Sequence, residues 1–197
     1  MKKYIVPTFS QWLPLSVAIV IIYAFIYLIV QQYIRQSANE ILAQIAIDAT
    51  EKIDAGVTAV QVVKDMHPAD MEKSLAPFII LYGAGGEPLA GSAFLHGKIP
   101  VPPQGVFDYA AQNGAYNISW QPEPNARSAI LVQSCTIEGK NGYLLSGRSL
   151  REIEQRELLV RQQVTVGTFI TLVATFIATF IGQIIKRRAN ISASTLA

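Results

Sequence analysis

The sequence predicts an α+β fold in which an antiparallel sheet of about five strands, with flanking long helices, lies between two transmembrane helices. Two observations predict it. Uncharged apolar stretches lie near both ends of the chain. Short runs of strand-forming residues, separated by glycine-rich and proline-rich turns, lie between them. Only 15% of the residues are charged, and the formal net charge is +2, so nothing indicates binding to nucleic acid.

The first apolar stretch, "WLPLSVAIVIIYAFIYLIV" at 12–30, carries no charge and is long enough to cross a hydrocarbon layer of about 30 Å. A cleaved signal peptide is the alternative, because Lys2 and Lys3 precede the stretch. We favour an uncleaved anchor, because the stretch exceeds the usual apolar region of roughly 7–15 residues and an amphipathic helix follows it directly.

The second stretch, "VTVGTFITLVATFIATFIGQII" at 164–185, is again uncharged. Basic residues precede the first stretch and follow the second in "KRR", which predicts that both termini are cytoplasmic. The expected order is a cytoplasmic N-terminus, a span, an extracytoplasmic domain, a second span and a cytoplasmic tail. These segments cover 1–11, 12–30, 31–163, 164–185 and 186–197.

Helical periodicity follows the first stretch. Apolar residues recur at steps of three and four and predict one buried stripe, formed by Ile34, Ala38, Ile41, Ile45, Ala49 and Ile53. Gly56 is expected to bend or end this helix. Steps of three then predict a short helix through Val57, Val60 and Val63.

A β-hairpin is predicted next, because the apolar run "FIILY" is followed by the turn residues "GAGGE" and the returning segment "PLAGSA". The proline-rich "LHGKIPVPPQG" is expected to be a loop. The segment "GVFDYAAQNG" predicts a short helix with Phe107, Ala110 and Ala111 inward and Gly114 at its end.

Three strands are expected after this helix. "AYNISWQP" places Tyr116, Ile118 and Trp120 on one face, "ARSAILVQSCTI" is expected to be central, and "GYLLSGRS" pairs back across "EGKNG". Ser149 and Glu152 then match a capping box that begins a helix at Leu150. Because no glycine or proline intervenes, this helix is expected to run unbroken into the second apolar stretch. We expect the helices to pack on one side of the sheet.

The stretches "SLAPFIILYGAGGEPLAGSAFLHGKIPVPPQGVFDYAAQNGAYNISWQP" and "YLLSGRSLREIEQRE" resemble the extracytoplasmic PAS-like sensor domains of the single-Cache type, found in bacterial membrane histidine kinases. The resemblance covers residues 33–162 and implies a location in the bacterial cytoplasmic (inner) membrane. Only "KRRANISASTLA" follows the second apolar stretch, and it contains no histidine for phosphorylation and no ATP-binding glycines. A direct kinase output is therefore not expected.

Catalytic chemistry is not expected, because no nucleophile and base, and no metal set, stand in a recognisable pattern. Cys135 lies within a predicted strand and is interpreted as a small buried hydrophobe. "GAGG" lacks the Gly-Lys-Ser/Thr ending of a phosphate loop. His96 lies in a loop, and the remaining candidate ligands are interpreted as a solvated helix end without metal spacing: Asp65, His67, Asp70 and Glu72. No cofactor and no metal are predicted.

A ligand pocket is expected where the resemblance and the predicted geometry agree, between the sheet and the connecting helix and loop. An apolar enclosure with one cation suits a small amphiphile or a carboxylate. Its candidate residues are Tyr82, Phe94, Phe107, Tyr109, Tyr116, Trp120 and Arg127. The alternative is that the aromatic residues are core and the arginine is on the surface.

Small and hydroxyl residues form a stripe on the second apolar stretch that predicts close helix packing: Thr168, Thr171, Thr175, Ala178 and Gly182. Its partner is open: the first span, a second copy in a homodimer or another membrane protein. The sequence thus predicts a non-enzymatic protein anchored in a lipid bilayer. Its exported domain is expected to bind a small-molecule ligand or a protein and to transmit through its membrane helices to a partner. A structural or assembly subunit of a membrane complex is the alternative.

Overall fold

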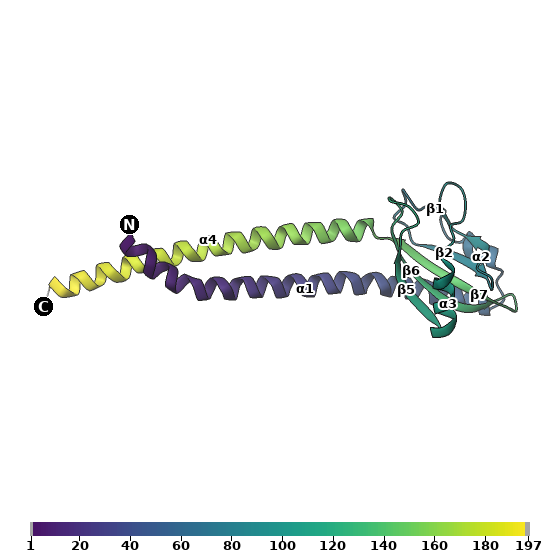
Figure 1. Ribbon diagram of the computed structural model, residues 1–197, viewed down its shortest axis with the longest axis horizontal. Coiled ribbons are helices and arrows are strands. Elements are labelled where there is room, and N and C mark those ends of the chain that lie inside the picture. Colours follow the sequence, from purple (N-terminus) through teal and green to yellow (C-terminus); the bar gives the residue numbers. More distant parts are fainter. Residues whose placement is uncertain (1, 196–197) are drawn as a thin grey trace. The chain divides into compact units, whose positions relative to one another are not determined.

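The computed structural model describes the backbone of residues 2–195, with the side chains of 6–188 apart from those of 35 and 38 (Figure 1). Two long helices, α1 (Lys2–Asp54) and α4 (Arg151–Thr195), begin and end the described chain. The chain forms two compact units: Tyr33–Gln155, here called the sheet unit, and the described parts of Met1–Gln32 and Arg156–Ala197, called the helical unit. Each is described by itself.

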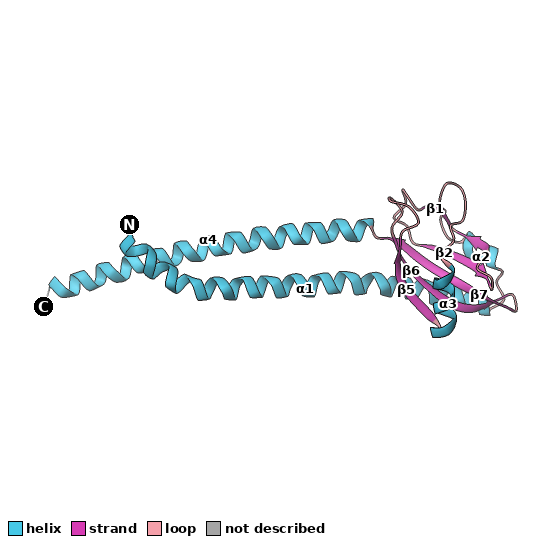
Figure 2. Cartoon of the chain, viewed as in Figure 1, coloured by secondary structure: helices cyan, strands magenta, loops and turns pink. Residues whose placement is uncertain are grey.

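The sheet unit contains an antiparallel sheet (Figure 2). Its five strands follow the order β3-β2-β7-β6-β5. Its strands are β2 (Phe78–Gly83), β3 (Pro88–Gly91), β5 (Ala115–Trp120), β6 (Ser128–Ile137) and β7 (Lys140–Ser149). The predicted α+β class, the β2–β3 hairpin and the three later strands are confirmed. Strand β6, which was expected to be central, is an interior strand between β7 and β5, and β7 occupies the middle position of the sheet.

Helices cover both faces of this sheet, so the expectation of a single helical layer is wrong. The C-terminal part of α1 and the short helix α2 (Ala59–Lys64) pack on one face, against Ile79, Leu81 and Leu144. Helix α3 (Gln104–Asn113) packs on the other face, against Ile80 and Leu145. Every residue of β2 is buried, which is the pattern of a strand covered on both sides.

The predicted stripe of α1 is confirmed at Ala49 and Ile53, but the buried row departs from it earlier in the helix. Leu42, Ala46, Ala49 and Ile53 face the sheet, whereas Ile41 is 38% exposed. Helix α1 and the sheet lie close together at this point, since the small side chain of Ser146 in β7 donates a hydrogen bond to the main-chain carbonyl oxygen of Leu42 at 2.9 Å. Periodicity of apolar residues alone did not distinguish this row from its neighbour.

Both short helices were expected. On α2, Ala59 and Val62 are buried and Val60 is 54% exposed, while Val63 and the preceding Val57 pack against the core as partly buried residues. On α3, Phe107 and Ala110 are buried as expected, but Val106 takes the inward position that was assigned to Ala111, which is exposed.

Tight turns end the elements where glycine was expected. Gly56 adopts a φ of +84° after α1, and Gly114 adopts +82° after α3. The β6–β7 hairpin closes through Glu138 and Gly139, with φ of +50° and +77°. Positive φ at both central residues matches the right-handed twist of the strands that such two-residue turns join.

Helix α4 begins at Arg151, and Ser149 caps it differently from the predicted box. The Ser149 Oγ accepts a hydrogen bond from the N–H of Arg151 at 3.3 Å, where the N–H of Glu152 was expected. The Glu152 carboxylate lies 2.6 Å from Nη2 of Arg148 instead. The expectation of an unbroken helix is confirmed, because α4 continues to Thr195.

A short parallel pair was not predicted at all. Strands β1 (Ala69–Asp70) and β4 (Ala93–Phe94) pair in parallel, Ala69 with Ala93 and Asp70 with Phe94. The N–H of Met71 donates to the carbonyl oxygen of Phe94 at 3.0 Å and extends the contact by one residue.

Within the helical unit, α1 and α4 are joined by polar contacts between apolar surfaces. The Trp12 indole N–H lies 3.2 Å from Oγ1 of Thr175, and the hydroxyl oxygens of Tyr23 and Thr171 lie 3.0 Å apart. The Gln183 amide donates to Oε1 of Gln11 at 2.6 Å. By length and composition, both helices are able to cross a membrane, a test that a signal sequence or the core helix of a soluble protein also passes.

These contacts show which residues of the predicted packing stripe lie against α1. Thr171 and Thr175 contact α1 of the same chain, while Ala178 is exposed and Gly182 faces open space. The contact row continues instead to Gln183, four residues after Thr179. Thr168 is partly buried and bonds to the Val164 carbonyl of its own helix at 2.7 Å.

Candidate functional site

The predicted aromatic pocket residues are divided among several places in the sheet unit. Tyr82, Phe107 and Trp120 are buried in the core under α3. The ring centroids of Tyr82 and Phe107 are 5.1 Å apart, and the Tyr82 hydroxyl donates to the carbonyl oxygen of Pro100 at 2.6 Å. Burial raises the pKa of Tyr82 well above its usual range. These three side chains belong to the packed core, and their role in ligand binding stays a prediction.

The other aromatic candidates lie outside this core. Tyr109 is 47% exposed and stacks on Tyr116 with ring centroids 4.1 Å apart. Phe94 lines an apolar groove between α2 and β3, together with Val60 and Leu89. The groove that Phe94 lines contains neither Tyr109 nor Tyr116. The role of these residues in ligand binding stays a prediction.

Arg127, the remaining candidate, lies in a different setting. It lines a charged depression of about 510 Å³, here called the polar groove, whose lining residues are Glu72, Lys73, Pro124, Asn125, Arg127, Arg151 and Glu154. Three cationic and two anionic side chains face this groove. Such a mixture suits a small zwitterion or a charged peptide segment better than an amphiphile, because it offers partners of both signs.

The first turn of α4 forms one wall of the polar groove. Nη1 of Arg127 lies 2.8 Å from Oε1 of Glu154, and the N–H of Leu150 donates to the carbonyl oxygen of Arg127 at 3.0 Å. The Arg151 guanidinium donates to the main-chain carbonyl oxygen of Glu72. Two loops of the sheet unit are thereby tied to the residues that begin the helix.

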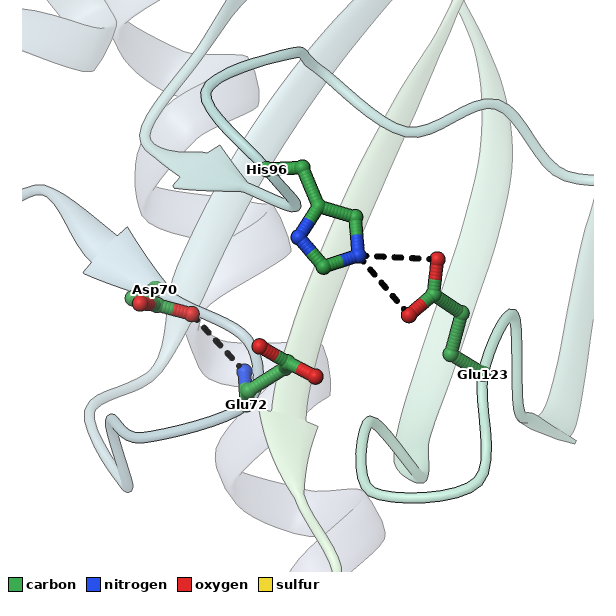
Figure 3. A network of polar contacts seen from close by, with 4 residues as sticks. All are labelled: Asp70, Glu72, His96 and Glu123. Carbon is green, nitrogen blue, oxygen red and sulfur yellow. Dashed lines mark hydrogen bonds and ion pairs between the residues drawn. The ribbon is translucent and has the colours of Figure 1, made fainter.

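A second group of polar side chains, here called the Glu/His cluster, consists of Glu72, His96 and Glu123 (Figure 3). The parallel register of β1 and β4 brings the first two together: Asp70 is opposite Phe94, so two residues further along each segment Glu72 comes beside His96. The carboxylate of Asp70 accepts a hydrogen bond from the N–H of Glu72 at 3.0 Å and holds this segment in place.

Backbone geometry also directs His96. His96 and Gly97 have φ of +50° and +77°, and Leu95 and Lys98 exchange two main-chain hydrogen bonds of 2.8 and 3.0 Å around them. The imidazole Nε2 lies 3.0 and 2.9 Å from the two carboxylate oxygens of Glu123. The hydrogen bond and the charge of Glu123 raise the pKa of His96, and Glu72 and Asp70 add to this effect.

Cys135 is partly buried on β6 and borders a third groove with Ser134 and Tyr143. Burial, with a smaller contribution from the charge of Asp54, raises the pKa of Cys135 to about 11. Its thiolate, the reactive form, is therefore scarce at neutral pH, in agreement with the interpretation of Cys135 as a packing residue.

Sequence reasoning identified only Arg127 among the polar residues of this region. It rejected Glu72 and His96 as separate surface groups and did not consider Glu123 or Glu154, because a parallel pair of two-residue strands leaves no periodic signal. Comparisons with protein-family models, curated proteins and solved structures found no match to this chain.

The positions of Phe107 and Tyr109 predict losses of stability of very different size on truncation. Phe107→Ala removes a fully buried ring and should lower the free energy of unfolding by about 3–5 kcal/mol. Tyr109→Ala, the matched control on the same helix, should cost about 1 kcal/mol or less because its ring is half exposed. Thermal and urea unfolding of the full chain in detergent measures both. Equal losses would contradict the assignment of Phe107 to the core.

The contact with Glu123 predicts a raised pKa for His96. Glu123→Gln should lower the pKa of His96 toward the ordinary value of a histidine, because the carboxylate charge and its charge-assisted hydrogen bond are lost. NMR titration of the two histidines, with His67 as internal control, measures it. A pKa raised by folding favours the folded state most below the unfolded value, and this contribution is lost as the pH rises through the pKa of folded His96. An unchanged His96 titration in the variant would contradict the Glu123 contact.

Proposed function

We propose that this chain is a non-enzymatic, membrane-anchored binding protein. In this proposal the sheet unit lies outside the bacterial cytoplasmic membrane, binds a small charged ligand or a charged protein segment in the polar groove, and transmits binding through α4 to a membrane partner. One observation carries the proposal: Arg151 and Glu154 line the groove and belong to the same helix as the second apolar stretch.

The contacts of the groove suggest how binding would act on α4. A ligand carboxylate would compete with Glu154 for Arg127, since a guanidinium binds carboxylates in a bidentate, charge-assisted manner. Loss of the Arg127–Glu154 pair would remove the side-chain tie between the first turn of α4 and the loop after β5, leaving the main-chain hydrogen bond of Leu150 to Arg127. A ligand shifts such an equilibrium only by its difference in affinity for the two arrangements, so the groove must bind better in one of them.

The membrane placement is supported by composition. The stretches 12–30 and 164–185 are uncharged, and basic residues stand just outside them at Lys2, Lys3 and "KRR". The five-stranded sheet with two long flanking helices agrees with the architecture expected from the resemblance to PAS-like sensors, and sensing is proposed on that resemblance.

A structural or assembly subunit is the second candidate, and the apolar groove favours it. Val60 and Leu89, which line this groove between α2 and β3, are 54% and 47% exposed. Exposed apolar side chains gathered in one depression are typical of protein contact sites. In that case the sheet unit would hold a protein, and no small molecule would act on α4.

The proposed topology predicts labelling from one side only. In a Cys135→Ala background, Asn113→Cys in the sheet unit should react with a membrane-impermeant maleimide in intact spheroplasts. Ser192→Cys in the tail should react only after the membrane is permeabilised. Labelling of the tail in intact spheroplasts, or protection of Asn113→Cys, would contradict the proposed orientation.

Groove binding predicts a response in the helical unit. In a Trp120→Phe background Trp12 is the sole tryptophan, and its emission reports the contact with Thr175. A panel of zwitterions and dicarboxylates should include a compound that stabilises the full chain thermally and shifts this emission. Arg127→Ala should abolish both effects, and the matched control Lys140→Ala should abolish neither.

Inserting four glycines after Arg161 separates binding from transmission. The insertion should leave the thermal stabilisation intact and remove the shift in Trp12 emission, because a flexible segment cannot pass on a helix movement. An unchanged shift would rule out transmission through α4. Absence of any stabilising compound, together with a stoichiometric co-purifying protein, would favour the assembly subunit.

A further inference from the structure

The Glu/His cluster joins donors that suit a metal ion. One ligand atom from each of Glu72, His96 and Glu123 lies within 4.8 Å of the other two. We propose that these three residues form a binding site for a divalent transition-metal ion, with Zn²⁺ as its representative. This inference is independent of the proposed function.

The spacing of two donors already fits a coordination shell. Bonds of roughly 2.1 Å from Zn²⁺ to imidazole nitrogen and carboxylate oxygen place neighbouring ligand atoms about 3.0–3.5 Å apart. Nε2 of His96 lies 2.9 and 3.0 Å from the Glu123 oxygens. Metal binding would replace the proton shared between these groups, and the Glu72 carboxylate would complete the set by a movement of about 1 Å or more.

The ion pair of His96 with Glu123 does not account for the position of the Glu72 carboxylate beside them. Among the described residues its carboxylate forms no hydrogen bond or ion pair, although the side chain is partly buried and faces His96 and Glu123 (Figure 3). Two carboxylates directed at one imidazole leave a net negative site even when the histidine is protonated. A bound dication removes that repulsion.

The donor set narrows the class of metal. A neutral imidazole with two carboxylates suits Zn²⁺ and neighbouring first-row ions, whereas Mg²⁺ and Ca²⁺ prefer sites made of oxygen alone. Three protein ligands leave a coordination position for water or for a bound molecule. Glu72 also lines the polar groove, so the proposed ion would lie at the rim of that groove.

Calorimetric titration of the chelator-stripped full chain in detergent with Zn²⁺ tests the proposal, and Co²⁺ absorption reports the coordination geometry. One ion should bind per chain. Glu72→Gln should weaken binding at least tenfold without lowering the metal-free melting temperature, because it breaks no described hydrogen bond and removes one of two carboxylates that repel each other. His96→Ala should also weaken binding at least tenfold.

His67→Ala is the matched control, since His67 is the only other histidine of the chain and lies outside the cluster. This variant should bind Zn²⁺ as the unmodified chain does. Unchanged affinity in Glu72→Gln, a loss confined to His67→Ala, or no binding at millimolar Zn²⁺ would overturn the proposal. Each of these results would leave His96 and Glu123 as a surface ion pair.

Discussion

The pairing of β2 with β7 is the constraint on which the rest of the sheet unit depends. Along β2, Ile80 enters the core under α3 while Ile79 and Leu81 enter the core under α1. The pairing is tight, because a Cβ at Gly147 would lie 2.3 Å from the ring of Phe78 opposite it. A slip of one residue would exchange the two cores, so this register decides which helix covers which face.

Both long helices are tied to this central pair. Helix α1 is held through its buried row and through the Ser146 hydroxyl of β7, and α4 begins two residues after β7 ends. A disturbance of β7 therefore reaches the helix that precedes the sheet by packing and the helix that follows it by chain continuity. This arrangement suits a domain whose state is read through its terminal helices, and it suits a rigid scaffold equally well.

Sequence patterns predicted the strands, the hairpins and the unbroken α4, because alternation, glycine turns and helix continuity are local properties. They failed where tertiary contact decides between local alternatives. Leu42 is buried and Ile41 is exposed at the point where the Ser146 hydroxyl of β7 bonds to the helix backbone, a contact that no local pattern reveals. Of the aromatic residues expected to enclose a ligand, Tyr82 and Phe107 pack against each other in the core, and their role in ligand binding stays a prediction. The Glu/His cluster could not be predicted, since its members come from three segments joined by long-range pairing.

Glu72 connects the two polar features that the sequence did not reveal. Its carboxylate faces His96 and Glu123, whereas its main-chain carbonyl oxygen accepts a hydrogen bond from Arg151, the first residue of α4. The cluster and the polar groove consequently share one residue with separate contacts through side chain and backbone. A shift of the Glu72 backbone would change both contacts, whereas a rotation of its side chain alone would change only the cluster. The start of α4 and the cluster thus meet in the same short segment, Asp70 to Lys73.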